Sequence, residues 1–137
     1  MKHQCKITVL ETKVFPDLQK KYLANPQSGP CPCFHAGDEF LFCRDNGRDD
    51  YWQLGLNTLT KTTANPDETA GGPQKPFCSE AWDCISRYVY AALQGGSIMK
   101  GWTNDEKMMI ACCNDGTRPV VFKIERIDID DETSSAS

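Results

Sequence analysis

Cysteine is the residue type that offers this chain the most chemistry, because eight of its 137 residues are cysteines. Two of them form a Cys-x-Cys pair, Cys31 and Cys33, in which each cysteine follows a proline. The prolines stiffen this turn, and two thiols one residue apart can both reach a single metal ion. The pair therefore indicates a metal-binding turn, although zinc ligands more often use Cys-x-x-Cys spacing, which this sequence lacks.

Three further cysteines lie where predicted helices or strands begin or end. Cys78 comes just before a predicted helix, where unpaired N–H groups and the positive end of the dipole favour the thiolate. Cys112 and Cys113 end a predicted strand and point to opposite faces, so only one of them can face a given site. We therefore predict that thiols from three distant parts of the chain converge on one site. Its candidate ligands are Cys31, Cys33, Cys78, Cys112 and Cys113.

The chemistry of such a site depends on what the thiolates bind. Structural zinc and iron–sulfur clusters both take thiolate ligands, so the predicted cofactor is an iron–sulfur cluster or zinc. His35, two residues after Cys33, is a candidate fourth ligand or proton donor. The predicted function is a small protein with a clustered thiolate site that binds metal, with no reaction assigned.

The residues leave other interpretations open. Cys78 could be the nucleophile of a metal-free thiol-dependent enzyme. The protein could instead be a non-catalytic interaction module whose partner surface includes Trp52, Trp82 and Trp102. The cysteines could also be reduced, buried thiols that pack as small hydrophobic residues. Whether the protein is an enzyme therefore stays open at the level of sequence.

Hydrophobic periodicity predicts the elements that must position these thiols. The clearest is a helix over residues 80–94, with Ser79 as its N-cap and Gly95-Gly96 as its stop. Its apolar residues recur at helical spacing and form one stripe. These residues are Ala81, Ile85, Tyr88, Val89 and Ala92. Cys84 lies on a different face and is predicted to be a small core or interface residue.

Apolar patterns predict strands at residues 5–10 and 39–43. A short helix is expected at residues 15–23, with Pro16 near its start, where a missing N–H costs least. Residues 107–113 and 119–127 flank Asn114-Asp115-Gly116, a strong turn signal, and are predicted to form a β-hairpin. The fold class is therefore α+β: a small antiparallel sheet with one principal helix and a C-terminal β-hairpin.

The length suits one domain, which we place at residues 1–127. It includes a polar, Gly- and Pro-rich excursion at about residues 44–76, with one short element expected near residues 51–59. Residues 128–137 are acidic and Ser-rich, and we expect them to form a disordered tail.

Composition restricts the partners and the location. The formal net charge is −4, so the chain lacks the basic footprint of a nucleic-acid-binding protein. Its apolar runs are too short to span a bilayer, and its N-terminus does not resemble a signal peptide. We therefore expect a cytoplasmic protein whose cysteines stay reduced. A protein partner, a second copy or a small-molecule substrate all stay open.

Several of these segments resemble a small uncharacterised cysteine-containing protein family of anaerobic bacteria and archaea. The similar residues are Cys33-Phe34-His35-Ala36-Gly37-Asp38-Glu39-Phe40, Cys78-Ser79-Glu80-Ala81, Gly95-Gly96, Ala111-Cys112-Cys113-Asn114-Asp115, Pro119-Val120-Val121-Phe122 and Arg126-Ile127. The resemblance implies shared thiols at Cys31 or Cys33, at Cys78, and at Cys112 or Cys113. It implies a three-thiol site and no particular substrate.

Overall fold

The computed structural model describes residues 1–43, 60–63 and 77–130. Five strands form one sheet in the order β3-β2-β1-β5-β4, and every pairing is antiparallel. In chain order the strands are β1 (Lys2–Thr12), β2 (Glu39–Cys43), β3 (Thr60–Lys61), β4 (Met108–Cys112) and β5 (Val120–Ile129). The helices are α1 (Pro16–Tyr22) and α2 (Ser79–Leu93). This confirms the predicted α+β class, with one principal helix and a C-terminal hairpin made of β4 and β5.

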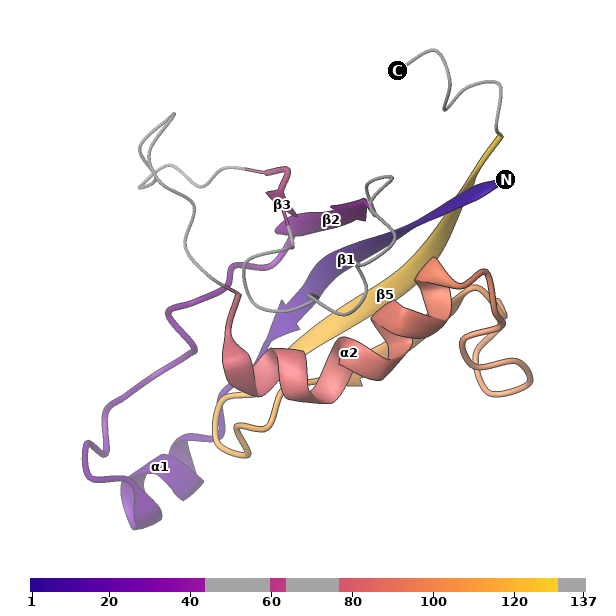
Figure 1. Cartoon of the computed structure of the whole chain (residues 1–137). Coiled ribbons are helices and arrows are strands. Elements are labelled where there is room, and N and C mark those ends of the chain that lie inside the picture. The colour runs from indigo at the N-terminus through magenta and orange to yellow at the C-terminus, as the bar shows by residue number, and fades with distance from the viewer. Residues whose placement is uncertain (44–59, 64–76, 131–137) are drawn as a thin grey trace.

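The two central strands, β1 and β5, pair along almost their whole length, with one irregularity between Val9 and Glu11. Alternate residues of each strand point to the face that α2 covers, and these residues are buried. On β1 and β5 they are Cys5, Ile7, Val9, Val120, Phe122 and Ile124. Figure 1 shows α2 lying across this face of the sheet, while α1 stands apart beyond one end of it.

Helix α2 forms because its apolar residues fall on one stripe, which packs on β1, β4 and β5. All five predicted stripe residues are buried, together with Leu93. At the C-terminal end, the Arg126 guanidinium donates to the carbonyls of Gly95 (2.8 Å) and Gly96 (2.6 Å). A cation at this position also offsets the negative end of the helix dipole. Within the described part of the chain, neither helix is long and apolar enough to cross a membrane.

Four phenylalanine rings make up the end of the core nearest to the start of α2. This phenylalanine cluster consists of Phe34, Phe40, Phe77 and Phe122, all buried. Phe34 lies edge-on to Phe122 with ring centroids 5.1 Å apart, and 5.2 Å from Phe77 in a tilted arrangement. Phe40 and Phe77 are also edge-to-face, at 5.1 Å. Such contacts stabilise more than the buried area alone, so the cluster joins three segments that are distant in sequence.

The predicted elements are present, with differences at their ends. β1 extends beyond residues 5–10 because its ends pair with β5. The N-cap of α2 is Cys78, and the predicted cap Ser79 is already the first helical residue. β5 runs to Ile129, so the first two residues of the predicted tail belong to the strand. Asp130 follows the strand and is exposed, while residues 131–137 of that tail and most of the polar excursion, including residues 51–59, lie outside the described residues.

Asp128, near the end of β5, is surrounded by three basic side chains. Its carboxylate accepts from His3 (2.8 Å) and Arg126 (2.9 Å), and Lys107 Nζ lies 3.1 Å away. Burial alone would raise the pKa of Asp128, but these hydrogen bonds and the charge of Arg126 together lower it well below its usual range. The carboxylate therefore fixes the end of β5 against β1 and against the C-terminal end of α2.

Phe122→Ala is expected to lower the free energy of unfolding by about 3–5 kcal/mol, because it removes a fully buried ring and leaves a cavity. Phe15→Ala, at a ring that is 47% exposed, should cost less than about 1 kcal/mol. Urea denaturation followed by circular dichroism measures both values. Similar small costs for the two variants would contradict the described core.

Asp128→Asn is expected to lower the free energy of unfolding at pH 7 by about 1–2 kcal/mol. The native carboxylate has a lowered pKa, so it stabilises the fold above the pKa of the unfolded chain, about 3.9. That stabilisation is lost as the pH falls from about 4 toward the lower pKa of the folded state. Denaturation of both proteins at pH 7, 5 and 3 should show the difference shrinking with acidification. Glu11→Gln, at a side chain that is 57% exposed, is the control and should change little. A difference that stayed constant down to pH 3 would contradict this role for Asp128.

Candidate functional site

Two segments place three of the predicted thiols close together. Cys33 directly precedes Phe34, and Cys78 directly follows Phe77. Because the rings of Phe34 and Phe77 pack against each other in the phenylalanine cluster, the adjacent cysteines are brought to the same end of the core. Cys31 lies two residues before Cys33 and packs partly against the core, as Cys78 does. We call Cys31, Cys33 and Cys78 the thiol cluster.

Cys31 and Cys33 interact directly. The backbone N–H of Cys33 donates to the Sγ of Cys31 (3.4 Å). Partial desolvation is the largest influence on the pKa of Cys33 and raises it, and the neighbouring thiols of Cys31 and Cys78 raise it further. The guanidinium of Arg118 acts in the opposite direction and lowers the pKa of Cys33. Cys33 therefore lies within electrostatic range of two thiols and one cation.

A buried glutamine fixes the loop that leads to Cys31. Gln19, on α1, is only 2% exposed. Its amide donates to the carbonyl of Gly29 (2.9 Å) and accepts from the N–H of Gly29 (3.0 Å). Gly29 has a φ of 73°, which glycine adopts without strain. The two hydrogen bonds thus hold the backbone two residues before Cys31.

The start of α2 determines the surroundings of Cys78. Cys78 is the N-cap residue, and its side chain makes no capping hydrogen bond. Its carbonyl accepts from the N–H of Trp82 (2.9 Å), which closes the first turn. The thiol therefore lies at the positive end of a 15-residue helix, as the sequence predicted from its position before the helix.

Cys112 and Cys113 belong to a second group of thiols, together with Cys84. Met109, Ala111 and Cys113 pack against the core, and Cys112 is exposed on the opposite face of β4. The structure thus resolves which member of the pair points inward, which periodicity alone does not. The Sγ of Cys113 accepts from the backbone N–H of Val120 (3.3 Å).

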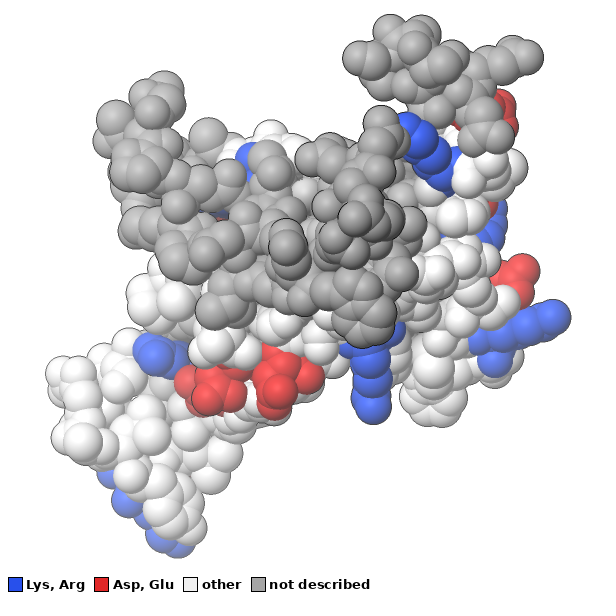
Figure 2. All heavy atoms as spheres, viewed as in Figure 1, with Lys and Arg blue, Asp and Glu red and all other residues white. Residues whose placement is uncertain are grey.

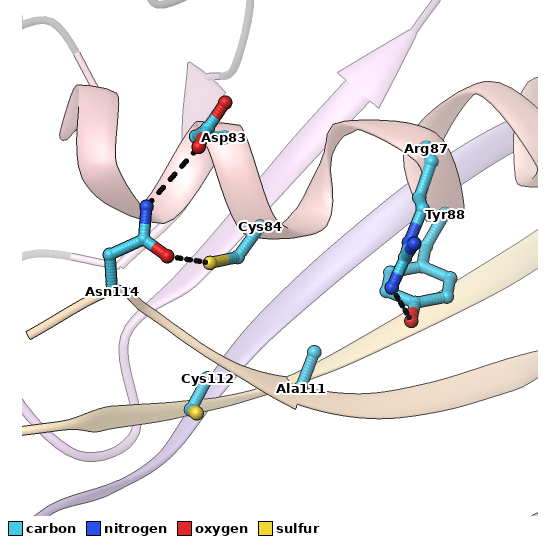
Figure 3. Close-up of a pocket in the computed structure, with 7 residues that line it drawn as sticks. All are labelled: Asp83, Cys84, Arg87, Tyr88, Ala111, Cys112 and Asn114. Atoms are coloured by element: carbon cyan, nitrogen blue, oxygen red, sulfur yellow. Dashed lines mark hydrogen bonds between the residues drawn. The ribbon is translucent and has the colours of Figure 1, made fainter. Parts of the chain in front are cut away.

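Cys84 holds the hairpin turn to α2 through Asn114 (Figure 3). The Cys84 thiol donates to the amide oxygen of Asn114 (2.9 Å), and the amide nitrogen donates to Glu80 (2.9 Å) and Asp83 (3.2 Å). Desolvation is the main cause that raises the pKa of Cys84, followed by Cys112, Asp83, Cys113 and Glu80. Cys84 is therefore protonated at neutral pH and is a poor nucleophile.

A pocket of about 350 Å³ lies beside the hydrogen bonds of Asn114, between α2 and the edge strand β4. Its lining residues are Asp83, Cys84, Arg87, Tyr88, Ala111, Cys112 and Asn114. Arg87 donates to the hydroxyl of its neighbour Tyr88 (2.9 Å). Part of this group is visible in the sequence, because Glu80, Asp83 and Cys84 have the i, i+3, i+4 spacing of one helix face. Nothing in the sequence linked that face to Asn114.

Cys5 and the candidate fourth ligand His35 lie in other parts of the fold. Cys5 is fully buried, and burial raises the pKa of its thiol to about 12, with a smaller contribution from Glu125. His35 is 53% exposed, and its ring nitrogen lies 4.0 Å from the buried carboxylate of Asp38. Asp38 also accepts from the backbone N–H of His35 (2.9 Å), so the pair shapes the turn into β2. The side chain of Cys43 is outside the described part of the structure.

The described cysteines are all unpaired: Cys5, Cys31, Cys33, Cys78, Cys84, Cys112 and Cys113. Among the residues that the structure describes, no three His, Cys, Asp or Glu side chains already lie where they would hold a metal ion. Comparison of the chain with protein-family models, with curated proteins and with solved structures found no match. The site must therefore be interpreted from its own geometry.

Gln19→Leu is expected to leave the N–H and carbonyl of Gly29 without partners, at a cost of about 1–3 kcal/mol in the free energy of unfolding. The loop before Cys31 should loosen, and the amide of Gly29 should exchange with solvent faster. Hydrogen exchange followed by NMR measures this rate. Gln27→Leu, at an exposed residue of the same loop, is the control. Unchanged exchange at Gly29 in Gln19→Leu would contradict the anchoring role.

Proposed function

We propose that the thiol cluster of Cys31, Cys33 and Cys78 binds a thiophilic metal, as zinc or as an iron–sulfur cluster. The carrying observation is the packing of Phe34 against Phe77, because it brings Cys33 and Cys78, from segments far apart in the sequence, to the same end of the core. The N–H of Cys33 also donates to the Sγ of Cys31. Bringing three thiols together at one end of a core costs conformational freedom, and the three sulfurs repel one another once they ionise. A bound metal cation offsets both costs, because it replaces the thiol protons and attracts the thiolates.

The surroundings of the cluster support thiolate ligands. An N–H donated to a ligand sulfur, as from Cys33 to Cys31, stabilises its negative charge. The positive end of α2 does the same at Cys78. Three thiolates and one Zn²⁺ carry a net charge of about −1 by the chemistry of such sites, and the Arg118 cation offsets it.

Binding would draw the sulfurs inward from their present positions. Cys33 is exposed and Cys31 is half-buried, so both side chains can rotate. The fixed parts of the site are the backbone at Gly29, held by Gln19, and the start of α2. Three protein ligands leave the fourth position of a tetrahedral zinc ion open for water or a substrate, the arrangement of catalytic zinc sites. The proposal therefore includes an enzymatic role for the metal-loaded protein.

The proposal also concerns location and partners. A cluster of reduced thiols fits a reducing compartment, so we place the protein in the cytoplasm. On the described part of the face drawn in Figure 2, acidic and basic side chains are interspersed and form no continuous basic surface. This supports a small molecule, a protein or a second copy as partner, in preference to nucleic acid.

Two observations favour the other interpretations. The position of Cys78 at the N-cap of α2 suits a nucleophile that needs no metal. Trp102 is 74% exposed, which suits contact with a partner protein, while Trp82 is half-buried and Trp52 lies outside the described residues. Neither observation accounts for the gathering of three thiols, so metal binding is the function we put forward.

Anaerobic titration of the full chain with Co²⁺, a spectroscopic substitute for zinc, should produce sulfur-to-cobalt charge-transfer absorption at one equivalent. Cys31→Ser, Cys33→Ser and Cys78→Ser should each weaken binding by more than about 100-fold, beyond the typical effect of outer-shell partners. Cys112→Ser, at an exposed thiol outside the cluster, is the matched control and should bind like the native protein. Protein purified without oxygen should contain zinc, or should contain iron and absorb visible light.

Two results would contradict the proposal. One is the absence of charge-transfer absorption in the reduced native protein. The other is equal loss of binding in Cys112→Ser and in the three cluster variants. A single fast-reacting thiol at Cys78, in a protein that binds no metal, would instead support the metal-free enzyme.

A further inference from the structure

The loop between β4 and β5 holds an arginine in a fixed position. Asp115 accepts four hydrogen bonds: from the N–H (2.9 Å) and hydroxyl (3.0 Å) of Thr117, and from the N–H (3.2 Å) and Nε (2.9 Å) of Arg118. Burial alone would raise the pKa of Asp115, but these hydrogen bonds lower it overall. Asp115 is therefore a charged anchor that both shapes the turn and orients the guanidinium of Arg118.

Only one edge of that guanidinium is used. Asp115 binds Nε, and the two terminal amino groups of Arg118 have no partner among the described residues. The side chain is 31% exposed, so these donors can be reached from solvent. A guanidinium held in this way presents a planar pair of N–H donors that matches the two oxygens of a carboxylate or another oxyanion.

The backbone places this loop beside the thiol cluster. The carbonyls of Thr117 and Pro119 accept from the N–H groups of Phe15 (2.8 Å) and Lys13 (2.9 Å), which fixes the loop against the segment entering α1. Three residues after Pro119, Phe122 packs against Phe34, the neighbour of Cys33. Asn114, in the same loop, donates to Glu80 and Asp83 in the first turns of α2, whose N-cap is Cys78.

The same arrangement distinguishes Arg118 from Arg126, which is also half-buried. Arg126 uses its guanidinium fully, on Asp128 and on the carbonyls of Gly95 and Gly96, and has a structural role. Arg118 is oriented by one partner, and its loop is hydrogen-bonded to the start of α2, where Cys78 lies. A positive charge alone would be enough to stabilise a thiolate. The hydrogen bond to Asp115 also fixes the direction in which the guanidinium N–H donors of Arg118 point.

Building on the proposed function, we propose that the thiol cluster takes a small anionic ligand, whose carboxylate or other oxyanion binds the terminal amino groups of Arg118. The opposite end of the ligand then lies at the sulfurs, or at the open position of a metal that they hold. This assigns the substrate class as small organic anions and makes Arg118 the residue that selects them.

Two alkylating reagents of nearly equal size test this directly on the metal-free, reduced full chain. Iodoacetate is an anion and iodoacetamide is neutral, and both react when a thiolate attacks the CH₂ carbon and displaces iodide. Mass spectrometry of peptides gives the two rates at each cysteine. Their ratio cancels the thiolate fraction, so any effect of Arg118 on the thiol pKa drops out.

The expected iodoacetate-to-iodoacetamide ratio is about two- to five-fold higher at the cluster thiols than at Cys112, the size of effect expected for a half-exposed ion pair. At Cys84, beside Glu80 and Asp83, the ratio should be lower than at Cys112. Arg118→Gln should reduce the ratio at the cluster thiols to the Cys112 value and leave the other ratios unchanged. Arg118→Lys, which keeps the charge, should retain part of the preference.

A ratio at the cluster thiols equal to that at Cys112 in the native protein would overturn the proposal, as would an undiminished ratio in Arg118→Gln. Should Arg118→Gln fail to fold by circular dichroism, Arg118→Lys decides by the same comparison. Because alkylation is measured without metal, failure here leaves the Co²⁺ titration unaffected. If the protein prefers iodoacetate but fails to bind Co²⁺, the anion site stands and only the proposal of metal binding is rejected.

Discussion

The packing of Phe34 against Phe77 and Phe122 is the contact on which the site depends. These rings belong to three segments that are distant in the sequence. Their burial contributes on the order of 1.5–3 kcal/mol per ring. Because Cys33 and Cys78 are the covalent neighbours of Phe34 and Phe77, the core contact that stabilises the fold also brings the two thiols together. Stability and the candidate site therefore share one physical cause.

Around that contact, polar groups fix the loops that hydrophobic packing leaves undetermined. Gln19 holds Gly29, and Asp115 holds Thr117 and Arg118. Each anchor pairs a charged or amide side chain with backbone groups that would otherwise lack partners. At the far end of α2, Arg126 has the same function for Gly95 and Gly96. The anchors nearest to the thiols lie on the two loops that flank them, which is where preorganisation matters for binding.

Much of the fold follows from local sequence signals, and the errors have identifiable causes. The apolar stripe of α2 and the turn at residues 114–116 depend on neighbours in the chain, so periodicity and turn chemistry predicted them. The length of β1 depends on its pairing with β5, more than 100 residues away, so local pattern underestimated it. At the start of α2, Ser79 has the better capping side chain, yet Cys78 has the extended backbone of the cap.

The site was harder to predict than the fold. The packing of Phe34 against Phe77 brings Cys33 and Cys78 to one end of the core, but the ligand role predicted for the two thiols stays a prediction. Three features of the site depend on how the β4–β5 hairpin packs against α2. They are the inward direction of Cys113, the hydrogen bond of Cys84 to Asn114 and the free edge of the Arg118 guanidinium. No local pattern encodes that placement, because it is set by side-chain packing across the sheet.

X-ray absorption at the zinc edge of the zinc-loaded full chain tests the central claim most directly. The account predicts a first shell with three sulfurs at about 2.3 Å and one lighter atom. It also predicts that this sulfur signal disappears when Cys31, Cys33 and Cys78 are replaced together by serine. A first shell without sulfur, or a sulfur signal that survives the triple replacement, would contradict it.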